Sequence, residues 1–90
     1  MARNVIWKYD IPHRQTEIEM PYGAQVIHVD EQYTNLCLWA IVNPQEERMD
    51  TRLFHVVHTG EPFFLSETEC HVGTVVMSRG AYVAHVFEMK

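Results

Sequence analysis

The sequence predicts an all-β domain, with an antiparallel sheet of five to seven strands that forms a small sandwich or a partly open barrel. Short runs of β-branched and aromatic residues recur about every 8–12 positions, and turn-forming residues separate them. Residues 36–42 are apolar without interruption, and a strand carries such a run only when both of its faces are covered. Strands with two apolar faces in so short a chain must cover one another, which favours a sandwich or barrel.

The candidate strands, in chain order, are residues 5–9, 16–20, 24–30, 36–42, 51–59, 71–77 and 82–89. The first two flank a turn at residues 12–15 and alternate apolar with polar side chains, so we expect them to form a half-exposed edge hairpin. The run at 36–42 stops at Asn43-Pro44, too soon for a typical helix, and is expected to be the central strand. Gly73, inside a strand, predicts a bulge or a close backbone approach.

The composition predicts one soluble domain that does not bind nucleic acid. The 90 residues are 47% hydrophobic and 21% charged, which is a globular composition, and a core this thin favours a homo-oligomer, most simply a dimer. The net charge of −5 opposes binding to a phosphate backbone. No apolar stretch approaches the ~20 residues that span a bilayer, so we expect no membrane association and a cytosolic location in whatever cell makes the protein. Cys37 and Cys70 are expected to be reduced.

The histidines do not predict a metal site. His55 and His58 lie three positions apart, and on a strand that spacing places them on opposite faces. The chain also lacks a nucleophile motif, a glycine-rich phosphate loop and a Cys-x-x-Cys pair, so we expect neither catalysis nor a cofactor. His58, at a strand end beside Thr59-Gly60, is the best functional candidate among the histidines.

Two aromatic groups are candidates for binding a partner. Trp7 and Tyr9 share one face of the first strand and would make an interface hot spot if they were exposed. Phe63, Phe64 and Leu65 interrupt a stretch of turn-forming and acidic residues, 60–69. Such a loop either folds back over the core as a lid or offers an exposed patch to a partner.

The order of several short blocks resembles a family of small uncharacterised phage and prophage proteins, a domain of unknown function. The blocks, which cover almost the whole chain, are Ile6-Trp7-Lys8-Tyr9, Pro21-Tyr22-Gly23-Ala24, Cys37-Leu38-Trp39-Ala40-Ile41-Val42, Thr59-Gly60-Glu61-Pro62, Val72-Gly73-Thr74-Val75 and His85-Val86-Phe87-Glu88. Glu61 stands where such relatives usually carry histidine, which argues against a histidine site there. The resemblance implies a phage origin and, by analogy, a counter-defence role.

Four functions are then compatible with the sequence. The first is a non-enzymatic inhibitor, similar to anti-CRISPR proteins, that binds a host protein complex through acidic loops and the Phe63-Phe64-Leu65 patch. The second is an oligomeric sponge that encloses a small nucleotide signal with Arg52, Arg79, His58 and stacked aromatic side chains. A hydrolase with a site around His58 and Glu61, or a virion or assembly component, completes the set. The inhibitor is the function that the charge and the apolar loop favour.

Overall fold

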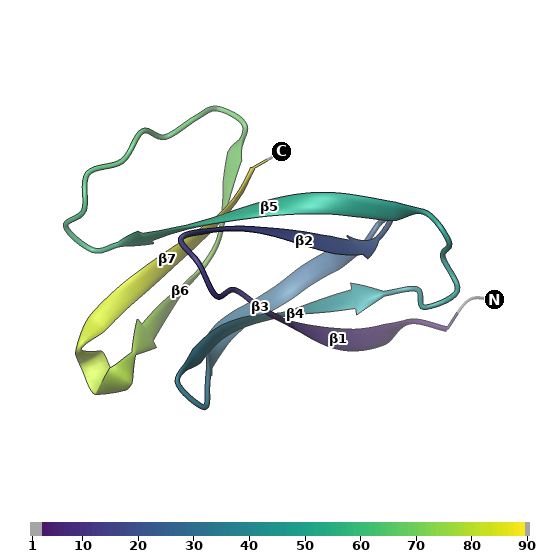
Figure 1. The fold of residues 1–90 in the computed structure, drawn as a ribbon, viewed down its shortest axis with the longest axis horizontal. Coiled ribbons are helices and arrows are strands. Elements are labelled where there is room, and N and C mark those ends of the chain that lie inside the picture. Colours follow the sequence, from purple (N-terminus) through teal and green to yellow (C-terminus); the bar gives the residue numbers. More distant parts are fainter. Residues whose placement is uncertain (1–2, 90) are drawn as a thin grey trace.

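A computed structural model describes residues 3–89 of the chain, and these residues form seven strands (Figure 1). The strands are β1 (Val5–Asp10), β2 (Gln15–Pro21), β3 (Gln25–Gln32), β4 (Asn35–Val42), β5 (Met49–His58), β6 (Glu69–Met77) and β7 (Tyr82–Met89). A single 3₁₀ turn, η1 (Ser78–Gly80), joins β6 to β7. Each strand overlaps the range that the sequence predicts.

The strands form two antiparallel sheets that face each other as a sandwich and do not close into a barrel. The three-stranded sheet has the order β1-β4-β3, and the four-stranded sheet has the order β2-β5-β7-β6. The all-β antiparallel prediction is therefore confirmed, in its sandwich form. The chain crosses between the sheets at three connections, β1–β2, β2–β3 and β4–β5.

The expected hairpin of the first two strands is wrong, because β1 pairs with β4 and β2 pairs with β5. The connection between them carries Ile11 into the core, where it is 4% exposed. The Ile11 N–H donates to the Leu36 carbonyl in one sheet (2.8 Å), and the Val56 N–H of the other sheet donates to the Arg14 carbonyl (2.8 Å). The connection therefore crosses from one sheet to the other, because this path buries Ile11 and pairs these backbone groups. Both strands do lie at sheet edges, as predicted.

The core lies between the sheets and takes alternate residues from each strand. The largest fully buried side chains are Phe54, Met20, Leu38, Val42, Val86 and Cys37. β4 is the central strand of its sheet, as predicted. Its outward face is not fully covered, since Trp39 and Ile41 stay partly exposed, so the expectation that both faces of residues 36–42 are buried is wrong.

Gly73 lies where the two sheets come closest. The pairing of β6 with β7 shifts register between His71 and Gly73, which confirms the predicted bulge. A Cβ atom placed on Gly73 would lie 2.4 Å from Cγ2 of Val29 in β3, closer than two carbon atoms can pack. The absence of a side chain at Gly73 therefore allows β3 and β6 to pack together along one side of the sandwich.

Candidate functional site

The β5–β6 loop, residues 59–68, extends from the four-stranded sheet at the upper left of Figure 1. Near its start, Glu61 forms an ion pair with Arg14, and the Glu61 N–H donates to the His58 carbonyl (3.0 Å). At its end, the Glu69 carboxylate accepts the Ser66 N–H (3.1 Å) and contacts Nδ1 of His55 on β5 (3.0 Å). The loop is thus attached to the body of the domain at both ends.

The apolar residues of the β5–β6 loop divide between the two roles that the sequence left open. Phe63 packs on Phe87 of β7, with the ring centroids 5.5 Å apart, and keeps 43% of its surface exposed. Phe64 is 98% exposed and Leu65 is 66% exposed. Phe63 therefore folds back onto the sheet, while its two neighbours face the solvent.

The carboxylates that hold the β5–β6 loop are poor proton acceptors. The hydrogen bond from Arg14 lowers the pKa of Glu61, and the Arg14 charge adds to this effect. The hydrogen bond from the Ser66 N–H is the main cause of the lowered pKa of Glu69, and the bond to His55 is the second. Both carboxylates hold the loop in place in their ionised form. A general base instead needs a pKa near neutral pH, and neither of these groups has one.

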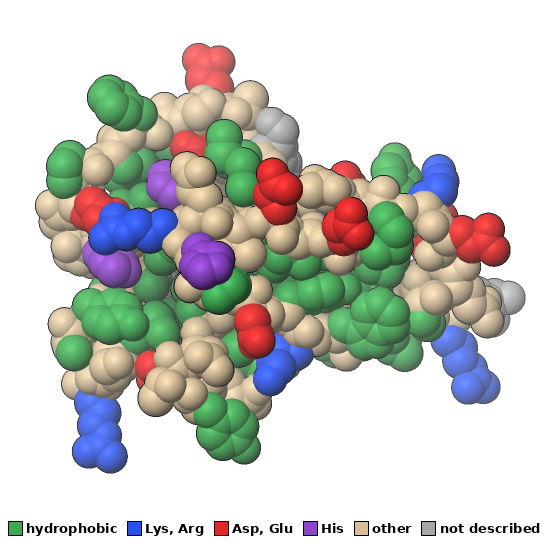
Figure 2. Space-filling model, viewed as in Figure 1, with side chains coloured by type: hydrophobic (Ala, Val, Ile, Leu, Met, Phe, Trp, Pro, Cys, Tyr) green, Lys and Arg blue, Asp and Glu red, His purple; other side chains and the backbone are tan. Residues whose placement is uncertain are grey.

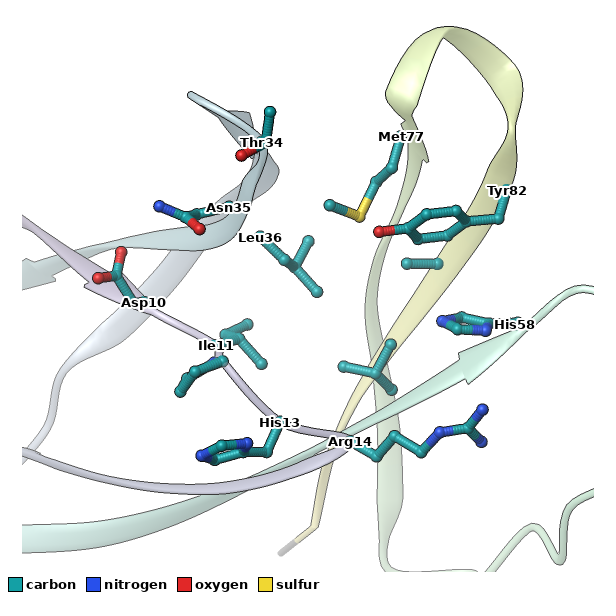
Figure 3. Close-up of a pocket in the computed structure, with 13 residues that line it drawn as sticks. Asp10, Ile11, His13, Arg14, Thr34, Asn35, Leu36, His58, Met77 and Tyr82 are labelled. Atoms are coloured by element: carbon teal, nitrogen blue, oxygen red, sulfur yellow. The ribbon is translucent and has the colours of Figure 1, made fainter.

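A pocket of about 310 Å³ opens at one end of the sandwich, where the β1–β2, β3–β4 and β6–β7 connections meet (Figure 3). We call it the end pocket. Its polar lining comes from Asp10, His13, Arg14, Thr34, Asn35, His58 and Tyr82, and its remaining lining from Ile11, Pro12, Leu36, Val56, Met77 and Ala84. The rings of His58 and Tyr82 lie against each other with centroids 5.1 Å apart. The end pocket therefore has an apolar floor and a polar rim, as ligand sites usually do.

The outward face of the four-stranded sheet carries a chain of hydrogen bonds between threonine and histidine. Nε2 of His85 lies 2.7 Å from the Thr59 hydroxyl, and its Nδ1 lies 2.9 Å from the Thr74 hydroxyl. The Thr74 hydroxyl is in turn 3.0 Å from Nε2 of His71. Each imidazole here has a hydroxyl partner, which orients the rings on the sheet. His55 lies on this face and His58 lies on the opposite one, as the strand spacing predicts.

The structure disperses the other predicted site residues. Trp7 and Tyr9 share the inward face of β1, where Tyr9 packs on the core and burial raises its pKa, while Trp7 stays 42% exposed. Arg79 is exposed in η1, with φ 57°, and does not line the end pocket. Arg52 pairs with Glu88, and its Nη1 donates to the Ala24 carbonyl (2.6 Å).

Sequence reasoning missed Arg14, His13 and Tyr82, which lie in the end pocket beside the predicted His58. Arg14 also joins the pocket to Glu61 of the β5–β6 loop. Only the crossing of the β1–β2 connection between sheets brings Arg14 to this end. The available signal is the polar run His13-Arg14-Gln15 after the first strand, which the sequence pattern alone predicts to be a simple turn.

The described residues can be assessed for metal-binding clusters and for helices long enough to span a membrane. Within residues 3–89, no three His, Cys, Asp or Glu side chains are arranged to hold a metal ion. In the same part of the chain, no helix has the length and apolar character to cross a membrane. Cys37 and Cys70 are both free thiols, Cys37 buried and Cys70 exposed.

Fold and surface together define a small β-sandwich domain with an anchored apolar loop and an open pocket at one end. The chain belongs to the family described as Domain of unknown function (DUF7352), whose model matches residues 2–90. No curated protein and no solved structure matches it.

Proposed function

We propose that this chain is a non-catalytic binding domain that docks on a partner protein through the β5–β6 loop. The observation that carries the proposal is the exposure of Phe64, whose aromatic side chain is almost entirely in contact with solvent. Leu65, next to it in the chain, is also exposed. Figure 2 shows hydrophobic side chains projecting at the place of this loop, at the upper left of the molecule. Exposed apolar side chains grouped in this way mark interaction sites.

The attachment of the loop adds to this argument. A free loop loses conformational entropy when it binds, and that loss weakens the complex. Here the Glu61–Arg14 pair, the Glu69 contacts and the packing of the Phe63 ring against Phe87 already restrict the loop. The exposed aromatic is therefore presented from an ordered support, as hot-spot residues usually are. The domain's charge of −5 would favour approach to a basic partner surface.

The partner in this proposal is a host protein complex, and the domain acts as a phage-encoded counter-defence inhibitor in the host cytoplasm, as the resemblance to small phage proteins implies. A hydrolase around His58 and Glu61 is less well supported, because Arg14 holds Glu61 ionised with a lowered pKa. A nucleotide sponge that uses Arg52 is also less well supported, because the Arg52 guanidinium is already paired with Glu88 and bonded to Ala24.

The test compares three tagged forms of the whole chain, each used to recover proteins from the cells in which the chain is made. Wild type and Tyr33→Ser should enrich the same protein, since Tyr33 is an 87% exposed aromatic on a different turn. Phe64→Ser should lose it by about tenfold or more, as expected when a hot-spot side chain is removed. Equal recovery by all three forms would show that the β5–β6 loop is not the docking surface.

A further inference from the structure

The end pocket is where the unpartnered histidines gather. Of the six histidines in the chain, His28, His55, His71 and His85 each have a side-chain partner. The imidazoles of the other two, His13 and His58, make no hydrogen bond to any residue between 3 and 89, and both line the end pocket. Polar side chains left free around an apolar floor are the usual arrangement of a ligand site.

The rim of the end pocket has two sides of opposite character (Figure 3). Asp10 and Asn35 lie on one side, and they offer acceptor oxygens and an anionic charge. Arg14 and His58 lie on the other side, and they offer N–H donors and a cationic charge. Among residues 3–89, the Asp10 carboxylate accepts one hydrogen bond, from the Cys37 thiol at 3.3 Å.

The Arg14 side can accept an anion although Arg14 already contacts Glu61. The pair with Glu61 uses Nη1, and a guanidinium has five N–H donors in a planar fork. The Arg14 side chain is also 62% exposed, so its remaining donors can be reached. The rings of His58 and Tyr82, in contact at an angle of 45°, also line the pocket.

Between the two sides lies an apolar floor made of buried side chains from both sheets. Ile11 and Leu36 are 4% and 8% exposed, and Val56, Met77 and Ala84 are 6%, 3% and 0% exposed. The pocket volume of about 310 Å³ is at the small end of the range for organic ligands. The space therefore suits a molecule built around a single ring or a short apolar segment.

We propose that the end pocket binds a small organic molecule with an apolar middle, an anionic group at one end and a cationic or donor group at the other. The anionic group pairs with Arg14 and His58, the apolar middle lies on Ile11 and Leu36, and the cationic group faces Asp10. This site is separate from the exposed residues of the β5–β6 loop, so it stands or falls independently of the proposed docking function.

Three probes of nearly the same shape test the proposal, each titrated into the whole isotope-labelled chain and followed by amide NMR shifts. 4-(Aminomethyl)benzoate carries both charged ends on one ring, 4-methylbenzoate lacks the cation, and 4-methylbenzylamine lacks the anion. The first probe should bind in the millimolar range and shift the amides that line the end pocket. Each single-ended probe should bind about two- to fivefold more weakly. Shifts centred elsewhere, or equal affinity for all three probes, would overturn the proposal.

Variants then assign each end. Asp10→Asn should reduce the affinity for 4-(aminomethyl)benzoate to that for 4-methylbenzoate and leave 4-methylbenzoate binding unchanged. Arg14→Gln should weaken both benzoates and spare 4-methylbenzylamine. Glu61→Gln, which breaks the same ion pair without removing the cation, should not weaken the benzoates, and Phe64→Ser should change nothing. Loss of affinity for every probe in Glu61→Gln would show that Arg14 acts only on the loop, and this outcome would also overturn the proposal.

Discussion

At Gly73, a missing side chain controls how closely the two sheets pack. A methyl group there would collide with the 6% exposed Val29, so Gly73→Ala should lower the free energy of unfolding by about 1–3 kcal/mol. Urea titration of the wild type and the variant measures this loss. Adding Val29→Ala should recover part of it, since the two sites are in contact and their effects do not add. Strict additivity of the two substitutions would show that Val29 is not the obstacle.

Arg52 and Glu88 form an ion pair in which both side chains are mostly buried, 14% and 8% exposed. The hydrogen bonds that Arg52 donates to the Glu88 carboxylate are the main cause of the raised pKa of Arg52. Because a buried charge without its partner is costly, Arg52→Met should destabilise the domain by about 3–5 kcal/mol. Replacing both residues, Arg52→Met with Glu88→Leu, should cost much less.

Thermal unfolding of the single and double variants separates these effects. Glu46→Gln, which breaks the exposed pair with Arg48, is the control and should leave the melting temperature unchanged. If the single and double variants at Arg52 and Glu88 melted together, the pair would not be the source of the loss.

At the scale of elements, the contact of Glu69 with Ser66 and His55 makes the attachment of the β5–β6 loop depend on pH. The pKa of Glu69 is lowered from its ordinary 4.5, so its stabilising effect is complete above that pH and is lost as the pH falls through the lowered value. Glu69→Gln should therefore be less stable than wild type at neutral pH, and the difference should shrink in acid below pH 4.5.

Urea unfolding at a series of pH values measures that difference. Glu67→Gln removes the same charge two residues earlier, at an exposed loop residue with no hydrogen bond to residues 3–89, and it is the matched control. A stability difference for Glu69→Gln that stays constant from neutral pH into acid would mean that the charge of Glu69 does not hold the loop.

The elements also show which parts of the fold follow from sequence alone. Periodicity and turn residues locate every strand, because those signals act within a few neighbouring residues. The partners of β1 and β2 do not follow, because the pairing depends on burying Ile11 and on backbone bonds to strands far along the chain. The same crossing brings Arg14 to the end pocket. Without the correct pairing of β1 and β2, the sequence therefore could not predict that Arg14 lines this site.

At the scale of the whole molecule, the outward face of the three-stranded sheet predicts self-association. Ile6, paired with Ile41, is 57% exposed there, and Ile41 and Trp39 of β4 are themselves partly exposed. The corresponding face of the four-stranded sheet is better covered, since Val57 is 3% exposed. Apolar area of this kind on a small domain is stabilised by a twofold partner.

Sedimentation at micromolar concentration should therefore detect a dimer of the 10.6 kDa chain, and Ile6→Lys should convert it to the monomer. Phe64→Ser, on the other sheet, should leave the dimer intact and serves as the matched control. A wild type that sediments only at 10.6 kDa would contradict a role for this face in self-association.

The central claim, that the β5–β6 loop is a docking surface, has one direct measurement. A photo-crosslinking amino acid replaces Phe64 in one form of the chain and Tyr33, which is also highly exposed, in another, and both forms are irradiated in the cells that make the protein. The account predicts one discrete adduct from position 64, of constant mass and identity, and none of that kind from position 33. The same adduct from both positions would contradict this account. No adduct from position 64, in cells where the partner protein still co-purifies with the chain, would also contradict it.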